Sequence, residues 1–195
     1  MIRYHRNDTD KARKAVAALK KAKASNSSYN TPEVNAALAE MFHRKCYICE
    51  NKEGISSFQI EHLNPHRGDT ELMYDWNNLF WSCAHCNNIK NAKYEPILDC
   101  SQVDVDQKIA FRKEGYFGKN EKYRFIALEE SDEIKNTVAL VQEAYYGRTP
   151  QKILEATNIR RSLRRNLSDF KNLVREYEEA EDYDKEDIRC AIRRE

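Results

Sequence analysis

The sequence lacks any long hydrophobic run, and no stretch approaches the roughly 20 consecutive apolar residues that a membrane-spanning helix needs. Its first seven residues also lack the apolar segment of a secretory signal peptide. We therefore expect no membrane partner and a cytoplasmic location, where disulfide bonds are rare. The six cysteines of the chain then need another explanation.

An excess of charge of one sign is also missing, because 33 basic residues balance 32 acidic ones. A surface that attracts nucleic acid must therefore be sought locally rather than in the total charge. Up to Glu50 the chain has ten Lys or Arg against five Asp or Glu. This basic excess fits the solvated face of a helix or a surface that contacts phosphates, and the sequence leaves both interpretations open.

The 195 residues are enough for one domain with a substantial hydrophobic core. Helical spacing of apolar residues predicts several helices, and alternation with β-propensity predicts two strands. Thr31 is the expected N-cap of the second helix, and Pro32 its first residue. The charged residues 178–195 fit either a mobile tail or a partner-binding one. The predicted helices cover 9–24, 31–43, 84–91, 131–147 and 149–177, and the predicted strands cover 58–60 and 122–128.

Four of the cysteines form two Cys-x-x-Cys pairs, Cys46 with Cys49 and Cys83 with Cys86, separated by 33 residues. Two intervening residues let both thiolates turn towards one ion, and two such pairs complete the tetrahedral four-sulfur site that zinc prefers. We expect one structural zinc ion per chain, because four thiolates leave no open position for water. Coincidentally buried cysteines are the alternative, and the identical spacing argues against it. His85, inside the second pair, is expected to support the zinc site.

The segment 60–66 lies between the two cysteine pairs and is rich in His, Glu and Asn. Phosphodiester hydrolysis needs a base that is neutral near pH 7, and the imidazole of His62 suits this task. It also needs a hard divalent ion to neutralise charge on the phosphate. Such ions prefer oxygen ligands of the kind that Glu61 and Asn87 offer. The residues therefore indicate metal-assisted phosphodiester chemistry.

The combined motifs resemble those of the HNH endonuclease family, which has a ββα-metal fold. They read C-x-x-C, E-H-x-x-P, N-L and C-x-x-C-N-x-x-K over Cys46–Lys90. The resemblance implies that His62 activates the attacking water and that Asn78 fixes the loop between the strands. It also implies that Glu61 and Asn87 hold a catalytic Mg²⁺ or Mn²⁺ ion. The expected fold is α+β, with a small zinc-stabilised ββα-metal core embedded in a mainly helical chain.

Two positions depart from the commonest family pattern. The acid before the histidine is Glu61 rather than Asp, which lengthens the arm to the metal, and the last signature position is Asn87 rather than His. Lys90, one turn beyond Asn87, is suited to a phosphate contact. His66 and Asn88 are near neighbours that can share ligation, although a histidine in a polar loop is more often only solvated.

Outside the core, the chain is similar to the HNH subunits of Septu-type antiphage systems, the PtuB-like proteins. The similar parts are Met1–Tyr4, the CYICE segment at 46–50, Ile97–Asp99 and the helical second half. The resemblance implies an ABC-type ATPase partner of the PtuA-like kind, and helices that serve as its docking surface. Amphipathic helices equally often only complete a core. The predicted parts are a helical segment 1–45, an HNH nuclease core 46–97, and a mainly helical, partner-docking region 98–195.

The leading hypothesis is a metal-dependent endonuclease that cleaves DNA as the effector of an antiphage system. The resemblance also implies that the cleavage products carry 5′-phosphate and 3′-hydroxyl ends. The near-zero net charge favours a subunit that a partner delivers to its substrate. An RNA substrate such as tRNA stays open, because the core grips phosphates rather than bases. A zinc-dependent nucleic-acid-binding module without catalysis is the alternative from another class. The presence of His62, Asn78 and Asn87 argues against it.

Overall fold

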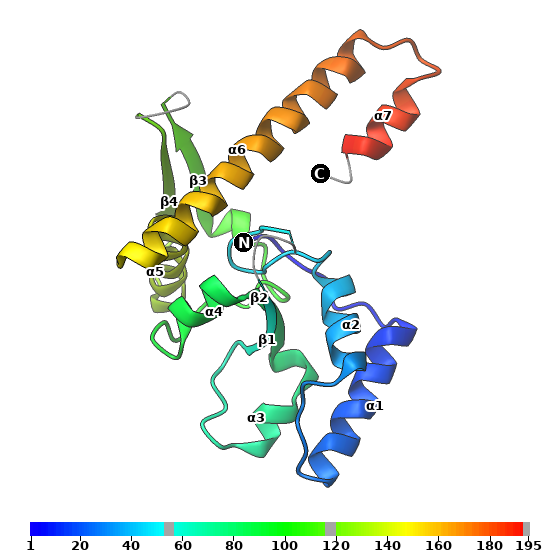
Figure 1. Cartoon of the computed structure of the whole chain (residues 1–195), viewed down its shortest axis with the longest axis vertical. Coiled ribbons are helices and arrows are strands. Elements are labelled where there is room, and N and C mark those ends of the chain that lie inside the picture. The colour runs from blue at the N-terminus through cyan, green and yellow to red at the C-terminus, as the bar shows by residue number, and fades with distance from the viewer. Residues whose placement is uncertain (53–56, 116–119, 193–195) are drawn as a thin grey trace.

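The structure, a computed structural model, describes residues 1–52, 57–115 and 120–192. This part of the chain has the predicted α+β fold, in which helices surround two small antiparallel sheets (Figure 1). The α-helices are α1 (Asp10–Ala24), α2 (Pro32–Met41), α3 (Thr70–Tyr74), α4 (Ala84–Lys90), α5 (Asp132–Tyr146), α6 (Pro150–Glu179) and α7 (Lys185–Ile192), and short 3₁₀ helices cover Trp76–Asn78 (η1) and Val105–Gln107 (η2). The strands are β1 (Phe58–His62), β2 (Leu79–Cys83), β3 (Ile109–Glu114) and β4 (Lys122–Ala127).

Local signals set the ends of the helices. Hydroxyl side chains at four N-caps accept a hydrogen bond from a first-turn backbone N–H: Thr9, Thr31, Ser131 and Thr149. The predicted cap and the predicted position of Pro32 at the start of α2 are confirmed. Gly147 ends α5 with a φ of 70°, and a Cβ there would lie 2.4 Å from backbone atoms of Lys152 and Ile153. Only glycine fits this close turn into α6.

The hairpin of β1 and β2, with α4 packed against it, lies at the centre of the molecule (Figure 1). In its register Phe58 lies opposite Cys83, and His62 lies opposite Leu79. All of β2 and the last three residues of β1 are buried. Because α4 begins directly after β2, the strand–loop–strand–helix order places the ends of β1 and α4 side by side. This is the ββα unit that the family resemblance implies.

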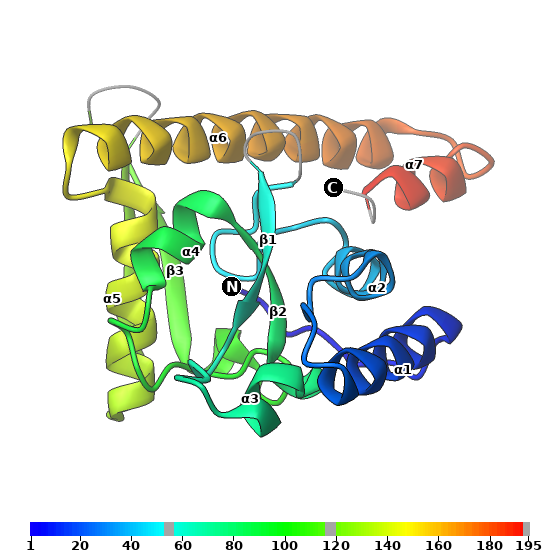
Figure 2. The same cartoon turned by 60° about the horizontal axis from the view of Figure 1, so that its bottom comes forward.

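Further elements cover both sides of this unit. Helices α1 and α2 lie together on one side, while β3, β4 and α5 lie on the other (Figure 2). A hydrophobic core cluster contains residues of all three predicted parts of the chain, including Leu38, Phe80 and Leu140. The added helices therefore help to complete one core, whatever else they bind.

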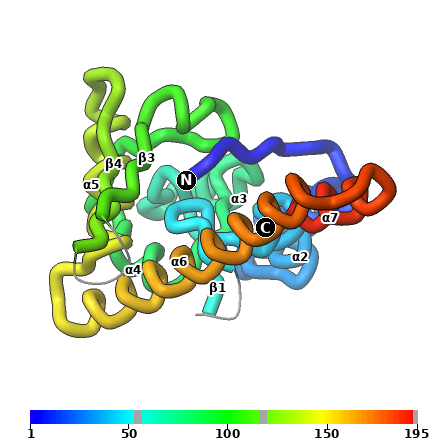
Figure 3. Tube along the Cα trace, turned by 90° about the horizontal axis from the view of Figure 1, so that it is seen from above, coloured from blue at the N-terminus to red at the C-terminus, as the bar shows by residue number. Residues whose placement is uncertain are grey.

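The two ends of the chain are held differently. The first residues run from the middle of the molecule to α1 (Figure 3). Along this stretch Tyr4 donates its N–H to the Cys100 carbonyl at 2.8 Å and its hydroxyl to Glu50 at 2.6 Å. At the other end, α6 extends past the ββα unit and α7 packs on α6 with no buried residue (Figure 1). The charged tail is thus helical over 185–192, and 193–195 lie outside the described residues. None of the described helices combines the length and apolar character that crossing a bilayer requires.

Candidate active site and metal centre

The side chains of Cys46, Cys49, Cys83 and Cys86 converge on one buried point. Their Sγ atoms all lie within 4.8 Å of one another, and those of Cys49 and Cys83 are 3.8 Å apart. A tetrahedron with zinc–sulfur bonds of about 2.3 Å has sulfur–sulfur edges of ~3.8 Å. Hydrogen bonds from the other thiols lower the pKa of the Cys83 thiol, whereas burial raises the pKa of Cys86, so the fit to a metal rests on the geometry of the four sulfurs. The four cysteines thus fit a closed, four-coordinate metal site of the zinc type.

Backbone hydrogen bonds hold the two cysteine pairs together. The first pair forms a tight turn in which Glu50, with a φ of 62°, donates its N–H to the Cys46 carbonyl at 2.9 Å. The second pair spans the junction of β2 and α4. The Tyr47 N–H donates to the Trp81 carbonyl on β2 at 3.0 Å, which brings the first turn against the second.

His85 fastens α4 to the C-terminal helices and does not point to the cysteine cluster. Its Nε2 lies 2.8 Å from the Ala144 carbonyl on α5, and its Nδ1 lies 2.6 Å from Oε2 of Glu155 on α6. Hydrogen bonds from His85 and Lys152 help to lower the pKa of Glu155 to about 2, against the opposing effect of its partial burial, so this carboxylate accepts. Both ring nitrogens of His85 are thus engaged, and these contacts hold the helix that carries Cys86 against α5 and α6.

His62, the predicted base, lies at the end of β1 with 9% of its surface exposed. Its Nε2 lies 3.0 Å from the Met73 carbonyl, which can only accept, so Nε2 carries the proton and Nδ1 keeps a lone pair. The rings of Tyr29 and His66 each lie 4.8 Å from the His62 ring. Burial lowers the pKa of His62, so the ring is neutral near pH 7. This is a fixed, neutral imidazole with one nitrogen free to take a proton.

Asn78, predicted to fix the loop between the strands, is buried at the end of η1, directly before β2. Its Oδ1 accepts from the Asn64 N–H at 2.8 Å, and its Nδ2 donates to the carbonyls of Asn64 and Leu72 at 2.9 and 3.0 Å. These bonds tie both ends of the 63–72 loop to one amide. Since Met73 follows directly, the same amide indirectly positions the carbonyl that holds His62.

Substituting Asn78 by Ala should lower the free energy of unfolding by about 1–3 kcal/mol, because three part-buried backbone groups lose their partner. Cleavage should fall with it, since the loop that positions His62 loosens. The exposed neighbour Asn77 is the matched control, and its Ala variant should change stability by less than about 0.5 kcal/mol. Urea denaturation measures both variants. Equal stability of the two would contradict the loop-holding role.

The predicted ligands on α4 point in different directions. Asn87 is half-buried and donates its Nδ2 to Oε1 of Gln59 on β1 at 2.7 Å, a bond that leaves its amide oxygen for another partner. Asn88 instead lines a small cavity with Glu155 and Asn158 of α6. The expectation that Asn88 shares ligation with Asn87 is therefore not supported, because adjacent helical residues face different neighbours. His66 is half-buried and close to His62.

Lys90 does not have the position expected of a phosphate contact. Only 1% of its side chain is exposed, and its Nζ donates to Oε1 of Glu61 at 2.5 Å and to the His62 carbonyl at 2.8 Å. The hydroxyl of Tyr47 donates to the other oxygen, Oε2 of Glu61, at 2.6 Å. This buried network was missed at the sequence level because Tyr47 belongs to the cysteine motif and carries no catalytic signature of its own.

As placed, Glu61 and Asn87 do not fit a shared catalytic ion. Both oxygens of Glu61 already accept from protein donors, and its side chain is 6% exposed. Burial raises the pKa of Glu61, and the Lys90 ammonium opposes that rise. A cation is thus already present at this carboxylate, and it belongs to the protein.

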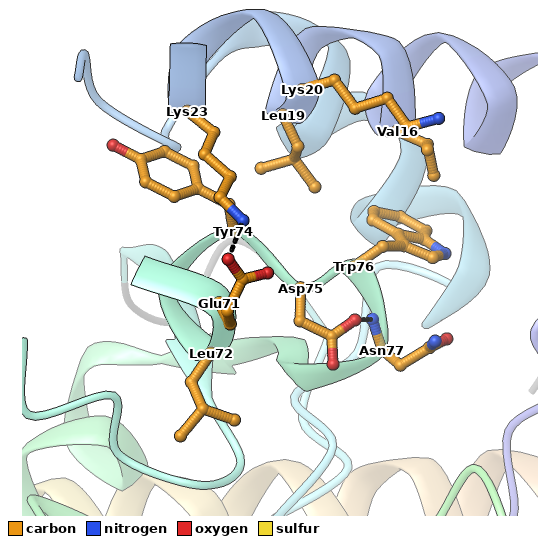
Figure 4. A pocket seen from close by; sticks show the side chains of 10 residues that line it. All are labelled: Val16, Leu19, Lys20, Lys23, Glu71, Leu72, Tyr74, Asp75, Trp76 and Asn77. Atoms are coloured by element: carbon orange, nitrogen blue, oxygen red, sulfur yellow. Dashed lines mark hydrogen bonds and ion pairs between the residues drawn. The ribbon is translucent and has the colours of Figure 1, made fainter. Parts of the chain in front are cut away.

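A groove of roughly 500 Å³ lies between α1 and the α3–η1 segment (Figure 4). It is lined by apolar side chains such as Leu19 and by the ion pair of Lys23 with Glu71, 2.5 Å apart. None of the predicted catalytic or metal-binding residues lines it. The candidate active site is therefore the surface at His62, and this groove is a neighbouring feature.

Comparison with known proteins agrees with this geometry. Residues 46–93 match the family model of the HNH endonuclease. Two curated relatives are called Septu protein PtuB: one from Bacillus thuringiensis is 35% identical over 79 residues, covering 38% of this chain and 31% of the relative. The other, from Bacillus mycoides (strain KBAB4), is 32% identical over 84 residues, covering 36% of this chain and 28% of the relative.

The matched stretch thus spans about a third of the length of these curated relatives. No solved structure matches the chain. The β1–β2–α4 unit, the four clustered cysteines and the family match coincide on one segment. Residues 46–93 therefore match the HNH endonuclease family both in sequence and in the ββα arrangement that carries the clustered cysteines.

Proposed function

We propose that this chain is a metal-dependent endonuclease in which His62 takes the proton from the water that attacks a phosphodiester bond. The observation that carries the proposal is the hydrogen bond from His62 Nε2 to the Met73 carbonyl, which leaves Nδ1 as the acceptor. Asn78 holds the loop in place around this pair. HNH nucleases use a divalent ion, here Mg²⁺ or Mn²⁺, which supplies charge neutralisation at the phosphate.

The four cysteines are proposed to hold one structural zinc ion per chain. Their sulfurs are mutually close and buried, and four thiolates leave no position for a reacting water. The ion would join the turn at Cys46–Cys49 to the junction of β2 and α4. It would thereby support α4, which carries Asn87, and β2, which pairs with the strand that carries His62.

The wider setting is proposed to be antiphage defence in the cytoplasm, with DNA as the substrate. Two relatives called Septu protein PtuB support this setting over the matched third of their length. The net charge of +1 gives the chain little general attraction for a polyanion, which favours delivery by a partner such as an ABC-type ATPase. Helices α6 and α7, which extend past the ββα unit, offer surface for such a partner.

The test is to incubate the protein with plasmid DNA and with total RNA, in Mg²⁺ or Mn²⁺, with and without a candidate ATPase partner. His62→Ala serves as the control in every combination. His62-dependent cleavage of DNA supports the proposal, whereas cleavage of RNA alone would show that the substrate is RNA and not DNA. Absence of cleavage in all combinations would favour a zinc-dependent nucleic-acid-binding module.

A further inference from the structure

Lys90 is a fully buried lysine whose ammonium group contacts the backbone of the predicted base. Its side chain is 1% exposed, and its Nζ lies 2.5 Å from Oε1 of Glu61 and 2.8 Å from the His62 carbonyl oxygen. Buried lysines are rare unless they are paired, because an ammonium loses much hydration energy on burial. A buried ion pair often adds little net stability over apolar residues of similar size, so this one needs a role besides stability.

The peptide group that joins His62 to Leu63 is held at both of its ends. Its carbonyl accepts from Lys90 Nζ at 2.8 Å, and its N–H, on Leu63, donates to the Asn78 carbonyl at 2.9 Å. The His62 ring is held separately by the Met73 carbonyl, 3.0 Å from Nε2. Contacts from α4, η1 and α3 therefore fix the end of β1 and the direction in which the free Nδ1 of His62 points.

The carboxylate of Glu61 keeps the Lys90 ammonium in this position. Its Oε1 accepts from Lys90, and its Oε2 accepts from the Tyr47 hydroxyl at 2.6 Å, so donors of the protein engage both oxygens. The Glu61 side chain is itself only 6% exposed. A buried ammonium needs a counter-charge, and a charged donor forms a stronger hydrogen bond than a neutral one. Glu61 thus lets Lys90 stay charged while it binds the His62 carbonyl.

We infer that Glu61 is a positioning residue in this chain and not an ion ligand: through the Lys90 ammonium it holds the His62 backbone and so orients the base. The inference rests on the proposed function, since it takes His62 as the base. It departs from the family motif, which assigns the acid before the histidine to the catalytic ion. The contacts favour the departure, because an ion on Glu61 would have to displace a buried ammonium that already neutralises the carboxylate.

A double-mutant cycle on the zinc-loaded protein tests the pairing of Glu61 with Lys90. Lys90→Met keeps most of the apolar stem but leaves a buried carboxylate without its counter-charge, so the melting temperature should fall by about 10 °C. Adding Glu61→Gln removes that charge, and at least about half of the loss should return. Lys93→Met is the matched control, because its ammonium pairs with Glu143 from an exposed position and should cost less than about 2 °C.

The double variant Glu61→Gln/Lys90→Met keeps the net charge and also tests the positioning role. Met cannot donate to the His62 carbonyl, so the Leu63 N–H should exchange with solvent at least about tenfold faster, relative to the Phe42 N–H, than in the wild type. The Phe42 N–H, in the core, donates to the Leu38 carbonyl at 2.9 Å and reports overall stability. In cleavage, kcat should fall at least about tenfold with KM within about twofold, because the base is misplaced and the substrate surface is not. An unchanged exchange ratio would overturn the inference.

Ion binding separates the positioning role from the ligand role that the family motif assigns. Mn²⁺ affinity of the double variant, measured by electron paramagnetic resonance and calorimetry, should stay within about threefold of the wild type, and a loss of about tenfold or more would overturn the inference. If neither variant folds, nuclear magnetic resonance of the wild-type lysine ammonium groups gives the answer. The Lys90 signal should persist when Mg²⁺ binds, and its disappearance would show that the ion takes Glu61. Exchange and ion binding do not use cleavage, so an inactive wild type would refute the proposed nuclease while the hold on the His62 backbone is still tested.

Discussion

His62→Ala is expected to reduce nucleic-acid cleavage by about 10²- to 10⁴-fold, the usual contribution of a positioned general base. The imidazole is neutral and oriented by the Met73 carbonyl, and Ala offers no group that takes a proton. Initial rates on plasmid DNA, with the divalent ion in excess, measure the loss. Thermal unfolding should show a variant that is still folded, because the side chain lies at the edge of the core.

The matched control for this variant is His66→Ala. His66 is the neighbouring imidazole, with its ring 4.8 Å from that of His62, and its Nδ1 accepts from the Gly68 N–H at 3.2 Å. Removal of His66 should lower the rate by less than about tenfold, since it is not the base. A larger loss for His66→Ala than for His62→Ala would transfer the role of the base to His66. Equal rates for His62→Ala and wild type would refute the proposed mechanism.

The metal centre and the ββα unit could be predicted because their signals are local. Cys-x-x-Cys spacing constrains both sulfurs of a pair, and β-propensity indicates the first strand, whereas the full order of strand, loop, strand and helix is what the resemblance of the combined motifs implies. The helices over 10–24, 32–41 and 132–146 were predictable for the same reason. Each of their N-caps is visible in the sequence as a Thr or Ser.

The contacts between side chains of different helices and strands could not be predicted from the sequence. A motif gives the spacing of Glu61 and Lys90 along the chain, but it does not state that the two face each other beneath the His62 backbone. It also does not state that Asn88 turns towards α6 while Asn87 turns towards Gln59. Strands β2 and β3 were not predicted from the residues. β2 is buried along its whole length, so it lacks the alternation that marks a half-buried strand, and the last four residues of β3, Phe111–Glu114, are mostly exposed, so that only pairing with β4 shows their conformation.

Cys46→Ser is expected to abolish zinc binding and to unfold the HNH domain. Structural zinc contributes about 10–16 kcal/mol of apparent binding free energy at neutral pH, while a whole domain is stable by only about 5–15 kcal/mol. Three remaining thiolates hold zinc more weakly, and the turn at 46–49 then lacks its attachment to β2 and α4. Elemental analysis should find about one zinc per wild-type chain and less than about 0.1 in the variant. Circular dichroism should show the accompanying loss of folded structure.

Cys100→Ser is the matched control, because Cys100 is equally buried and lies outside the four-cysteine cluster. The same change of one atom should leave the zinc content at about one and cost only about 1–2 kcal/mol of stability. A chelator that strips zinc should reproduce the Cys46→Ser phenotype in the wild type, and added zinc should reverse it. If the stripped wild type keeps its melting temperature, the four-cysteine site does not hold the scaffold. The positions of His62 and Asn87 would then depend on core packing alone.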